Sequence, residues 1–317
     1  MILAMLAYTL IVQSATELNE EFGLPGVLIF DEPHPGMPRA LVTTSTCTAE
    51  FYLQGAHLTQ WQPTGQAPAL FLSENSAYIP GKAIRGGIPV IFPWFGAPAN
   101  SPVHVASVSG QHGLARIWPW TMRFAALAGE DIHLSTRLDQ TEGVRALGFS
   151  GFELLYEVIL GKTLTVRLSV LNIGQQPFFF EEALHAYLAV GDSREVTVDG
   201  LQQTEFLDKT EGFTRKTQTT NTLRFEGEID RPYLNTTDPL SLRDPVLQRC
   251  LQLQKRNSRT TVTWNPGPDL AAKLPDVAPG AWKDFVCLET ANIAENAITL
   301  QPHEAHTMEM KLAVQQI

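Results

Sequence analysis

A strict alternation of apolar and polar residues is the sequence feature that most limits how this chain can fold. Apolar side chains occupy every second position from Leu164 to Val170, and polar residues fill the positions between them. The same alternation returns near the C-terminus, from Met308 to Leu312. A period of two is typical of a β-strand that buries one of its faces.

Further segments with strand character, separated by turn sequences such as Asn265-Pro266-Gly267-Pro268, extend over most of the chain. They are Ala40–Thr44, Ala49–Gln54, Ile132–Leu138, Glu153–Leu160, Glu195–Val198, Thr260–Trp264 and Phe285–Glu289. Helical periodicity is scarce, and only Pro245–Gln254 is predicted to form a short helix. Because strands do not alternate with helices, we expect an all-β fold of two packed antiparallel sheets with a cleft on one of them.

The domain organisation expected from these strands is simple. Strands follow one another from about residue 26 to the end, without a low-complexity linker or an internal repeat. We therefore predict one domain over residues 18–317, preceded by a weakly ordered extension of residues 1–17. The apolar run Met1–Val12 has no basic segment before it, and its 12 residues are too few to span a bilayer. No membrane anchor is expected.

Charge and cysteine content exclude several classes of function. The chain carries a formal net charge of −10, whereas sequence-independent nucleic-acid binding needs a basic face. An anionic ligand would therefore be held by a few placed arginines. The three cysteines, Cys47, Cys250 and Cys287, include no C-x-x-C pair. Since this pattern fits neither a disulfide framework nor a zinc site, we expect a cytoplasmic protein without bound metal. Exposed edge strands can pair between two chains, so we expect either a monomer or a weak dimer.

The stretch Lys82–Gly96, K-A-I-R-G-G-I-P-V-I-F-P-W-F-G, is predicted to form a rigid loop. Its paired glycines permit backbone conformations that are closed to other residues, while Pro89 and Pro93 exclude a helix and disfavour a central strand. Arg85 places one cation at the mouth of this loop. A second stretch, Gln111–Arg116, also ends in an arginine, and we expect the two arginines to bind one anion.

Three further side chains are candidates for chemistry, and each has a structural alternative. His185, in A-L-H-A-Y-L, is either a histidine satisfied within a sheet or a general acid or base, because imidazole titrates near neutrality. Glu289, in F-V-C-L-E-T, either reaches solvent or lies in a cleft with a raised pKa. Asp208 is equally compatible with a solvated turn. His57 and His104 have neither a partner nor a spacing that favours a functional role.

Taken together, eight motifs in fixed order resemble those of the hexose-6-phosphate mutarotases, the glucose-6-phosphate 1-epimerase branch of the aldose 1-epimerase superfamily. They are I-R-G-G-I-P-V-I-F-P-W-F-G (84–96), Q-H-G-L-A-R (111–116), A-L-H-A-Y-L (183–188), V-D-G-L (198–201), L-D-K-T (207–210), D-R-P-Y-L-N (230–235), W-N-P-G-P (264–268) and F-V-C-L-E-T (285–290). The resemblance extends over nearly the whole chain from about residue 20. It implies an all-β, galactose-mutarotase-like β-supersandwich with an open sugar-binding cleft.

The resemblance also implies roles for the candidate residues. His185 resembles the catalytic acid of that family and Glu289 its catalytic base, which open and close a sugar ring without cofactor or metal. The substrate-binding positions are matched by Arg85, Gln111, His112, Arg116 and Asp208, with the two arginines near the phosphate.

The implied activity is the interconversion of the α and β anomers of a hexose 6-phosphate, with glucose 6-phosphate as the expected substrate. The alternative is a catalytically idle module that binds sugar phosphates on the same fold, because a fold and its pocket do not prove turnover.

Overall fold

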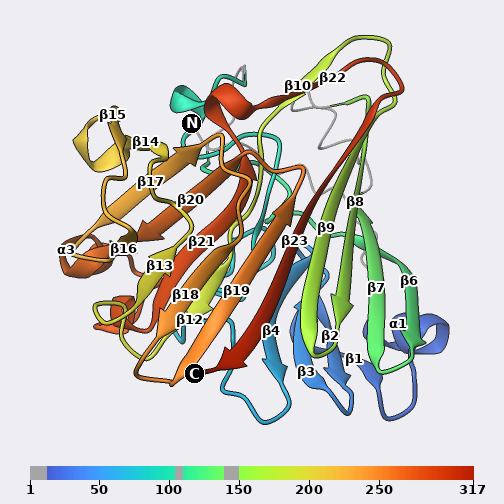
Figure 1. Ribbon diagram of the computed structural model, residues 1–317. Coiled ribbons are helices and arrows are strands. Elements are labelled where there is room, and N and C mark those ends of the chain that lie inside the picture. Colours follow the sequence, from blue (N-terminus) through green and yellow to red (C-terminus); the bar gives the residue numbers. More distant parts are fainter. Residues whose placement is uncertain (1–12, 104–109, 139–149) are drawn as a thin grey trace.

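The computed structural model describes residues 13–103, 110–138 and 150–317, and its regular structure is almost entirely β-strand (Figure 1). The strand pairs are antiparallel. The helices that the structure describes are short: α1 (Ala15–Phe22), α3 (Gly267–Ala271) and the 3₁₀ turns Pro98–Asn100, Lys209–Glu211, Ala281–Lys283 and Ala294–Asn296. The predicted all-β class is confirmed.

The described strands form one large sheet and three smaller sheets. The largest has nine strands in the order β16 (Thr222–Arg224), β13 (Thr197–Asp199), β18 (Leu240–Asp244), β19 (Arg249–Arg256), β23 (Ala305–Gln316), β9 (Thr163–Asn172), β8 (Phe152–Leu160), β7 (Asp131–Leu138) and β6 (Thr121–Ala128). The eight-stranded sheet runs β15 (Thr214–Thr217), β14 (Glu205–Asp208), β17 (Ile229–Leu234), β20 (Thr260–Asn265), β21 (Phe285–Asn292), β11 (Glu182–Leu184) and β5 (Val90–Ile91), and β12 (Tyr187–Ala189) also pairs with β21. The four-stranded sheet has β1 (Leu28–His34), β2 (Met37–Thr43), β3 (Cys47–Tyr52) and β4 (His57–Pro63) in chain order, and β10 (Phe178–Phe180) pairs with β22 (Ile298–Leu300).

The alternation in the sequence corresponds to the burial of alternate side chains in the central strands. In β9 every second residue from Leu164 is buried, and in β23 Met308, Met310 and Leu312 are fully buried. The other predicted strands also form, with ends that differ from the prediction by a few residues. The apolar faces of these strands meet in one large core.

The eight-stranded and four-stranded sheets lie against the nine-stranded sheet (Figure 1). Phe51 of β3 stacks on Tyr156 of β8, with ring centroids 6.2 Å apart. Toward the other end, Lys255 of β19 donates a hydrogen bond to Thr261 of β20 at 2.8 Å. The packed-sheet architecture is therefore observed, with the eight-stranded sheet carrying the cleft described below.

The helix predicted over Pro245–Gln254 is wrong. Residues 245–248 form a turn, and β18 and β19 on either side of it make an antiparallel hairpin. The Asp244 carboxylate stabilises the turn by accepting hydrogen bonds from the backbone N–H groups of Val246 and Leu247. Beyond the turn, the buried side chains alternate with more exposed ones, so the period is that of a strand. Short apolar runs of this kind do not distinguish the two structures locally.

The first residues that the structure describes pack on the fold. Helix α1 begins with a capping box, in which Ser14 and Glu17 satisfy each other's backbone N–H groups. Its Leu18 is fully buried, and Asn19 exchanges two hydrogen bonds with the backbone of Phe30 in β1. The predicted boundary between residues 17 and 18 therefore falls inside this helix, whereas residues 1–12 lie outside the described part. No described helix is long and apolar enough to cross a membrane.

Candidate active site

A cavity of about 920 Å³ opens on the eight-stranded sheet. Most of the predicted site residues line it, namely Arg85, Gln111, His112, Arg116, His185 and Glu289. They come from loops and strands that are far apart in the sequence, so the fold brings together the residues that the motifs singled out. Asp208 is not among the lining residues in the described part of the chain.

The predicted rigid loop forms one wall of the cavity. Gly86 has a φ of 118° and Gly87 a φ of 61°, and a Cβ atom on either would lie within 2.4 Å of a neighbouring carbonyl oxygen. Only glycine fits this close approach. The buried His57 holds the loop from behind, because its Nε2 lies 2.7 Å from the Gly86 carbonyl oxygen. A structural role for His57 agrees with its position; His104 lies outside the described residues. Within this stretch, the two-residue strand β5 pairs with β11 at the edge of the sheet.

The sheet register places His185 opposite Glu289. In the ladder between β11, β12 and β21, Leu184 pairs with Thr290 and Tyr187 pairs with Cys287, so residue 185 faces residue 289. The two side chains meet, with Nε2 of the imidazole 3.3 Å from Oε1 of the carboxyl group. Both side chains are almost fully buried, with His185 6% and Glu289 1% exposed. The carboxyl group therefore does not lie at a solvated strand end.

Burial pushes the pKa values of the two groups in opposite directions. It raises the pKa of Glu289 well above its usual range, and the charge of Asp230 adds to this effect. It lowers the pKa of His185 well below its usual range, as do the nearby arginines Arg116 and Arg85. These pKa directions favour the uncharged form of each group, so the pair holds one proton, on Glu289. The Nδ1 atom of His185 and Oε2 of Glu289 have no partner in the described part of the chain.

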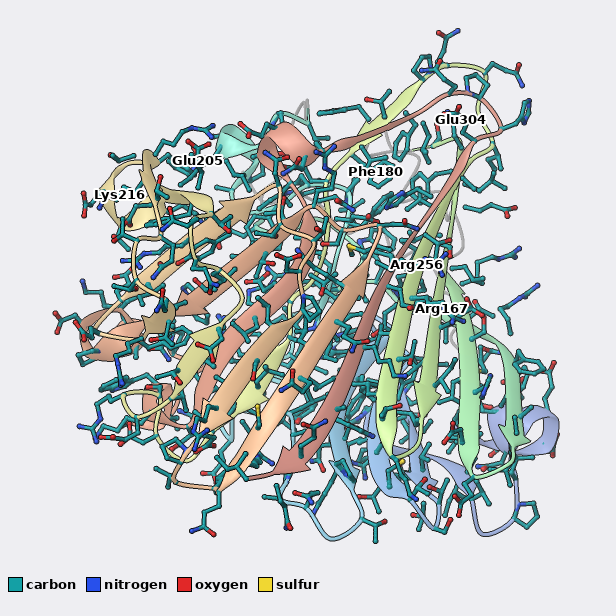
Figure 2. All side chains as sticks on the ribbon, viewed as in Figure 1. Arg167, Phe180, Glu205, Lys216, Arg256 and Glu304 are labelled. Atoms are coloured by element: carbon teal, nitrogen blue, oxygen red, sulfur yellow. The ribbon has the colours of Figure 1, made fainter. Side chains whose placement is uncertain are left out.

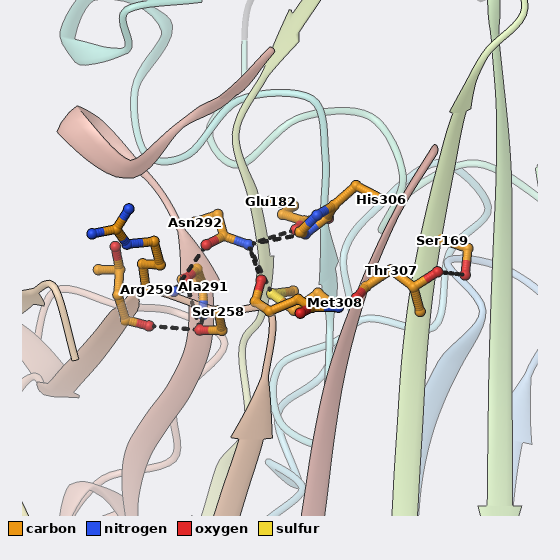
Figure 3. A network of polar contacts seen from close by, with 11 residues as sticks. Ser169, Glu182, Ser258, Arg259, Ala291, Asn292, His306, Thr307 and Met308 are labelled. Carbon is orange, nitrogen blue, oxygen red and sulfur yellow. Dashed lines mark hydrogen bonds and ion pairs between the residues drawn. The ribbon is translucent and has the colours of Figure 1, made fainter. Parts of the chain in front are cut away.

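A polar network supports the strands that carry this pair (Figure 3). Glu182 at the start of β11 faces Asn292 at the end of β21, and the Asn292 amide donates to the Glu182 carboxylate at 2.8 Å. Nε2 of His306, from β23 of the other large sheet, lies 2.9 Å from the same Glu182 oxygen. Burial disfavours the charged imidazole, but its hydrogen bond to Glu182 outweighs this and raises the pKa of His306. The two sheets are thus joined directly behind the cavity.

His112 presents one defined nitrogen to the cavity. Its Nδ1 accepts a hydrogen bond from the backbone N–H of Gly96 at 3.2 Å, so in the neutral ring the proton is on Nε2. Burial and the charge of Arg116 lower the pKa of His112, which keeps the ring neutral. Its ring meets that of His185 edge to face at 5.6 Å. His112 is therefore a hydrogen-bond donor beside His185.

The two arginines of the cavity differ in their partners. Arg85 is paired with Asp276, and its Nη2 lies 2.9 Å from a carboxylate oxygen. Among the residues that the structure describes, the Arg116 side chain makes one hydrogen bond, to the Gln111 carbonyl oxygen at 2.7 Å, and its buried Nε has no partner. Among the described residues no carboxylate is within ion-pair distance of Arg116. Burial, reinforced by the charge of Arg85, lowers the pKa of Arg116 to about 10. An anion in the cavity would compensate this charge.

Asp208 sits at the end of β14 with its carboxylate already engaged. It accepts hydrogen bonds from Thr210 at 2.6 Å and from Lys216 at 3.1 Å, and only 2% of the residue is exposed. Figure 2 labels Lys216 on the hairpin of β14 and β15, at the far edge of the eight-stranded sheet. Direct binding of a ligand by Asp208 stays a prediction, and it would require one of these donors to move.

Among the described residues that line the cavity, four charged ones were not singled out from the sequence: Glu181, Lys209, Asp230 and Glu295. Lys209 and Asp230 both line it and form an ion pair at 2.6 Å. Lys209 also lies over the ring of Phe95, 5.5 Å from its centroid. Both residues fall inside quoted motifs, but nothing local separates them from ordinary solvated charges. The described residues include no group of three or more side chains suited to a metal ion.

Comparison with known proteins identifies the matching family. The family model of aldose 1-epimerases matches residues 39–313. A protein of Escherichia coli (strain K12), provisionally named a glucose-6-phosphate 1-epimerase, is 35% identical over 258 residues, which cover 81% of this chain and 84% of that protein. The resemblance of the eight motifs is thereby confirmed.

Solved structures agree on the fold. A crystal structure from Salmonella typhimurium, provisionally described as a mutarotase, is 30% identical and has a TM-score of 0.85, covering 93% of this chain and 96% of its own. A galactose mutarotase-like protein from Clostridium acetobutylicum is 13% identical, with a TM-score of 0.70 over 92% of this chain and 98% of its own. The expected galactose-mutarotase-like architecture is confirmed.

Proposed function

Because the chain belongs to the aldose 1-epimerase family, we propose that it interconverts the α and β anomers of a hexose 6-phosphate. The observation that carries the proposal is the buried His185–Glu289 pair, 3.3 Å apart, in one cavity with the guanidinium of Arg116. Within the described residues that guanidinium has no carboxylate at ion-pair distance. The pair supplies an acid and a base for the ring, and the guanidinium supplies a site for the phosphate.

Anomer exchange requires one proton to leave the substrate and one to enter it. The Glu289 carboxylate takes the proton of the O1 hydroxyl, the bond between C1 and O5 breaks, and O5 receives a proton from the His185 imidazolium. Rotation about the C1–C2 bond then turns the other face of the aldehyde toward O5. Ring closure reverses both transfers and gives the other anomer, so each residue ends the cycle in its starting state.

The one-proton state of the pair matches this cycle. Ring opening starts from the form of the pair with its proton on His185 and leaves the proton on Glu289, the form that the two pKa directions favour in the unliganded site. The pair therefore keeps the same net charge throughout. A buried site favours such a step, because no additional charge has to be accommodated at low dielectric. Acid and base contributions of about 10²–10⁴-fold each are typical of groups placed in this way.

The phosphorylated substrate is supported by the charges around the cavity. Arg116 has no carboxylate partner in the described part of the chain. Arg85 and Lys209 are further cations of the lining, and each is paired with a carboxylate. Arginine binds phosphate through parallel hydrogen bonds, which also orient the sugar. Gln111 and His112 would contact sugar oxygens, and we keep Asp208 as a further substrate contact. Glucose 6-phosphate is the proposed hexose phosphate because it appears in the names of the relatives.

The proposal is tested by following the anomerisation of freshly dissolved α-glucose 6-phosphate by NMR exchange or polarimetry, beside free glucose and free galactose. We expect strong acceleration with the phosphorylated sugar and little with the free sugars. Binding without acceleration over buffer would leave the idle sugar-phosphate-binding module as the function. Equal acceleration of free galactose would remove the phosphate from the proposal.

A further inference from the structure

Arg85 is held at the cavity wall by two side chains that the catalytic scheme does not use. Its Nε donates to one oxygen of Asp276 at 3.0 Å and its Nη2 to the other at 3.2 Å, which makes a two-pronged contact. Its Nη1 donates to the hydroxyl oxygen of Tyr187 at 2.9 Å. The orientation of the guanidinium is therefore fixed at all three nitrogens: the Asp276 carboxylate binds Nε and Nη2, and the Tyr187 hydroxyl binds Nη1.

The short segment of residues 73–76 holds the backbones of Arg85 and Asp276 near each other. Ser73 donates its backbone N–H to the Arg85 carbonyl oxygen at 3.0 Å and its hydroxyl to the Asp276 carbonyl oxygen at 2.7 Å. The hydroxyl of Ser76 binds the Arg85 backbone as both donor and acceptor. Two residues that are 191 positions apart in the sequence are thus tied to the same turn.

Counting donors shows what this arrangement leaves for a ligand. A guanidinium has five N–H groups, and the contacts to Asp276 and Tyr187 use one each on Nε, Nη1 and Nη2. One N–H therefore remains on each terminal nitrogen in the described surroundings. Two such groups on the end of a guanidinium can bind two oxygens of one phosphate.

Tyr187 also contacts the acid–base pair. Its ring stacks on the imidazole of His185, with centroids 4.8 Å apart and an angle of 10° between the planes. Tyr187 is 2% exposed and lines the same cavity. The Tyr187 side chain thus contacts both Arg85 at the cavity wall and His185, the proposed proton donor to O5.

We propose that Asp276 and Tyr187 are positioning residues, which hold Arg85 so that its two remaining N–H groups receive the substrate phosphate. Tyr187 in addition fixes the distance between this anchor and His185, so the phosphate sets the register of the sugar ring against the acid. The inference rests on the proposed hexose-phosphate site and deepens it, because it assigns the geometry that selects a phosphorylated sugar.

The test measures binding separately from turnover. Dissociation constants for glucose 6-phosphate and for inorganic phosphate are determined by calorimetry on the wild type, Asp276→Asn and Tyr187→Phe. Each variant removes one restraint on Arg85 while keeping nearly the same shape, and we expect affinity for both ligands to fall about tenfold. Asp192→Asn is the matched control, because it weakens a similar two-pronged contact, with Arg194, outside the cavity. Its affinities should stay within about twofold of the wild type.

Kinetics then distinguish positioning from general damage to the fold. Asp276→Asn and Tyr187→Phe should raise KM for glucose 6-phosphate about tenfold with a much smaller change in kcat. Tyr187→Leu, which also loses the stack on His185, should lower kcat as well. Unchanged affinity in both Asp276→Asn and Tyr187→Phe would overturn the inference. Tighter phosphate binding by Asp276→Asn would also overturn it, because Asp276 would then compete with the ligand.

Failure of this inference is distinguishable from failure of the proposed function. A wild type that binds glucose 6-phosphate but does not accelerate its anomerisation contradicts the epimerase activity, while the calorimetric comparison of variants still decides the role of Asp276 and Tyr187. A wild type that binds neither phosphate nor glucose 6-phosphate overturns the inference itself.

Discussion

Glu289 and His185 are cross-strand neighbours, and the contact of 3.3 Å between Oε1 and Nε2 joins two residues that no local motif connects. His185 lies between β11 and β12, which both pair with β21. Glu289 is a residue of β21. Because adjacent strands lie about 5 Å apart, opposed side chains on one face meet directly. This contact is the basis of the first two predictions.

Replacing either member of the pair should abolish catalysis and leave the fold intact. Glu289→Gln and His185→Asn are expected to lower kcat for glucose 6-phosphate by about 10²–10⁴-fold, the usual contribution of a placed acid or base. NMR exchange measures the rate, and thermal unfolding checks the fold. Glu205→Gln, at an exposed position of β14, is the control and should keep wild-type activity. A fully active Glu289→Gln variant would exclude this residue as the base.

The dependence of kcat on pH should have a broad plateau. The His185–Glu289 pair is active when it holds one proton. It loses activity at low pH, when a second proton binds, and at high pH, when the remaining proton leaves. Burial lowers the pKa of His185 and raises that of Glu289, so the acid limb should fall below pH 6.5, the ordinary histidine value. We choose kcat rather than kcat/KM because the phosphate of the free substrate titrates at about pH 6. An acid limb centred above pH 6.5 would contradict the assignment.

Removing the charge of Arg116 should stabilise the unliganded protein while it impairs phosphate binding. The guanidinium is buried at Nε without a carboxylate partner among the described residues. Arg116→Met is therefore expected to raise the free energy of unfolding by about 1–3 kcal/mol and to lose the stabilisation that phosphate gives the wild type. Thermal unfolding with and without phosphate measures both effects. As a contrast, Arg39→Met should destabilise, because Arg39 is ion-paired with Asp31 and Glu50.

The contact between His306 and Glu182 should make stability depend on pH. The folded-state pKa of His306 is raised above 6.5, so its stabilising contribution is complete below pH 6.5 and is lost as pH rises through the folded value. His306→Gln should flatten this decline in chemical unfolding experiments at pH 6 and pH 8.5. His303→Gln, at an exposed turn position, should retain it. An identical decline in His306→Gln would assign the effect to other groups.

The fold class could be predicted because strand periodicity is a local property. Alternate burial in β9 and β23 follows directly from the alternation in the sequence. The prediction failed at Pro245–Gln254, where the turn after Asp244 and the partner strand β23 decide the structure. A short apolar segment fits a helix or a strand equally well until its neighbours are known.

The candidate site could be predicted in part, because several of its side chains belong to recognisable motifs. Arg85 and His185 were found in this way, whereas Lys209 was not, although it lies in a quoted motif. Its ion pair with Asp230 is what distinguishes it from a solvated lysine. Asp276 lies in none of the motifs, and its contact with Arg85 spans 191 positions of the chain.

Local patterns and motifs were enough to predict the all-β class, the family resemblance and the residue types available for acid–base chemistry. Which charges are compensated depends on how the chain folds. Arg85 and Arg116 look equivalent in the sequence, yet one is paired with Asp276 and the other has no carboxylate partner in the described part of the chain. The same holds for His185 and Glu289, whose pKa directions arise from burial and neighbouring charges. Electrostatic energy depends on distance and on exclusion of water, and neither quantity is a property of local sequence.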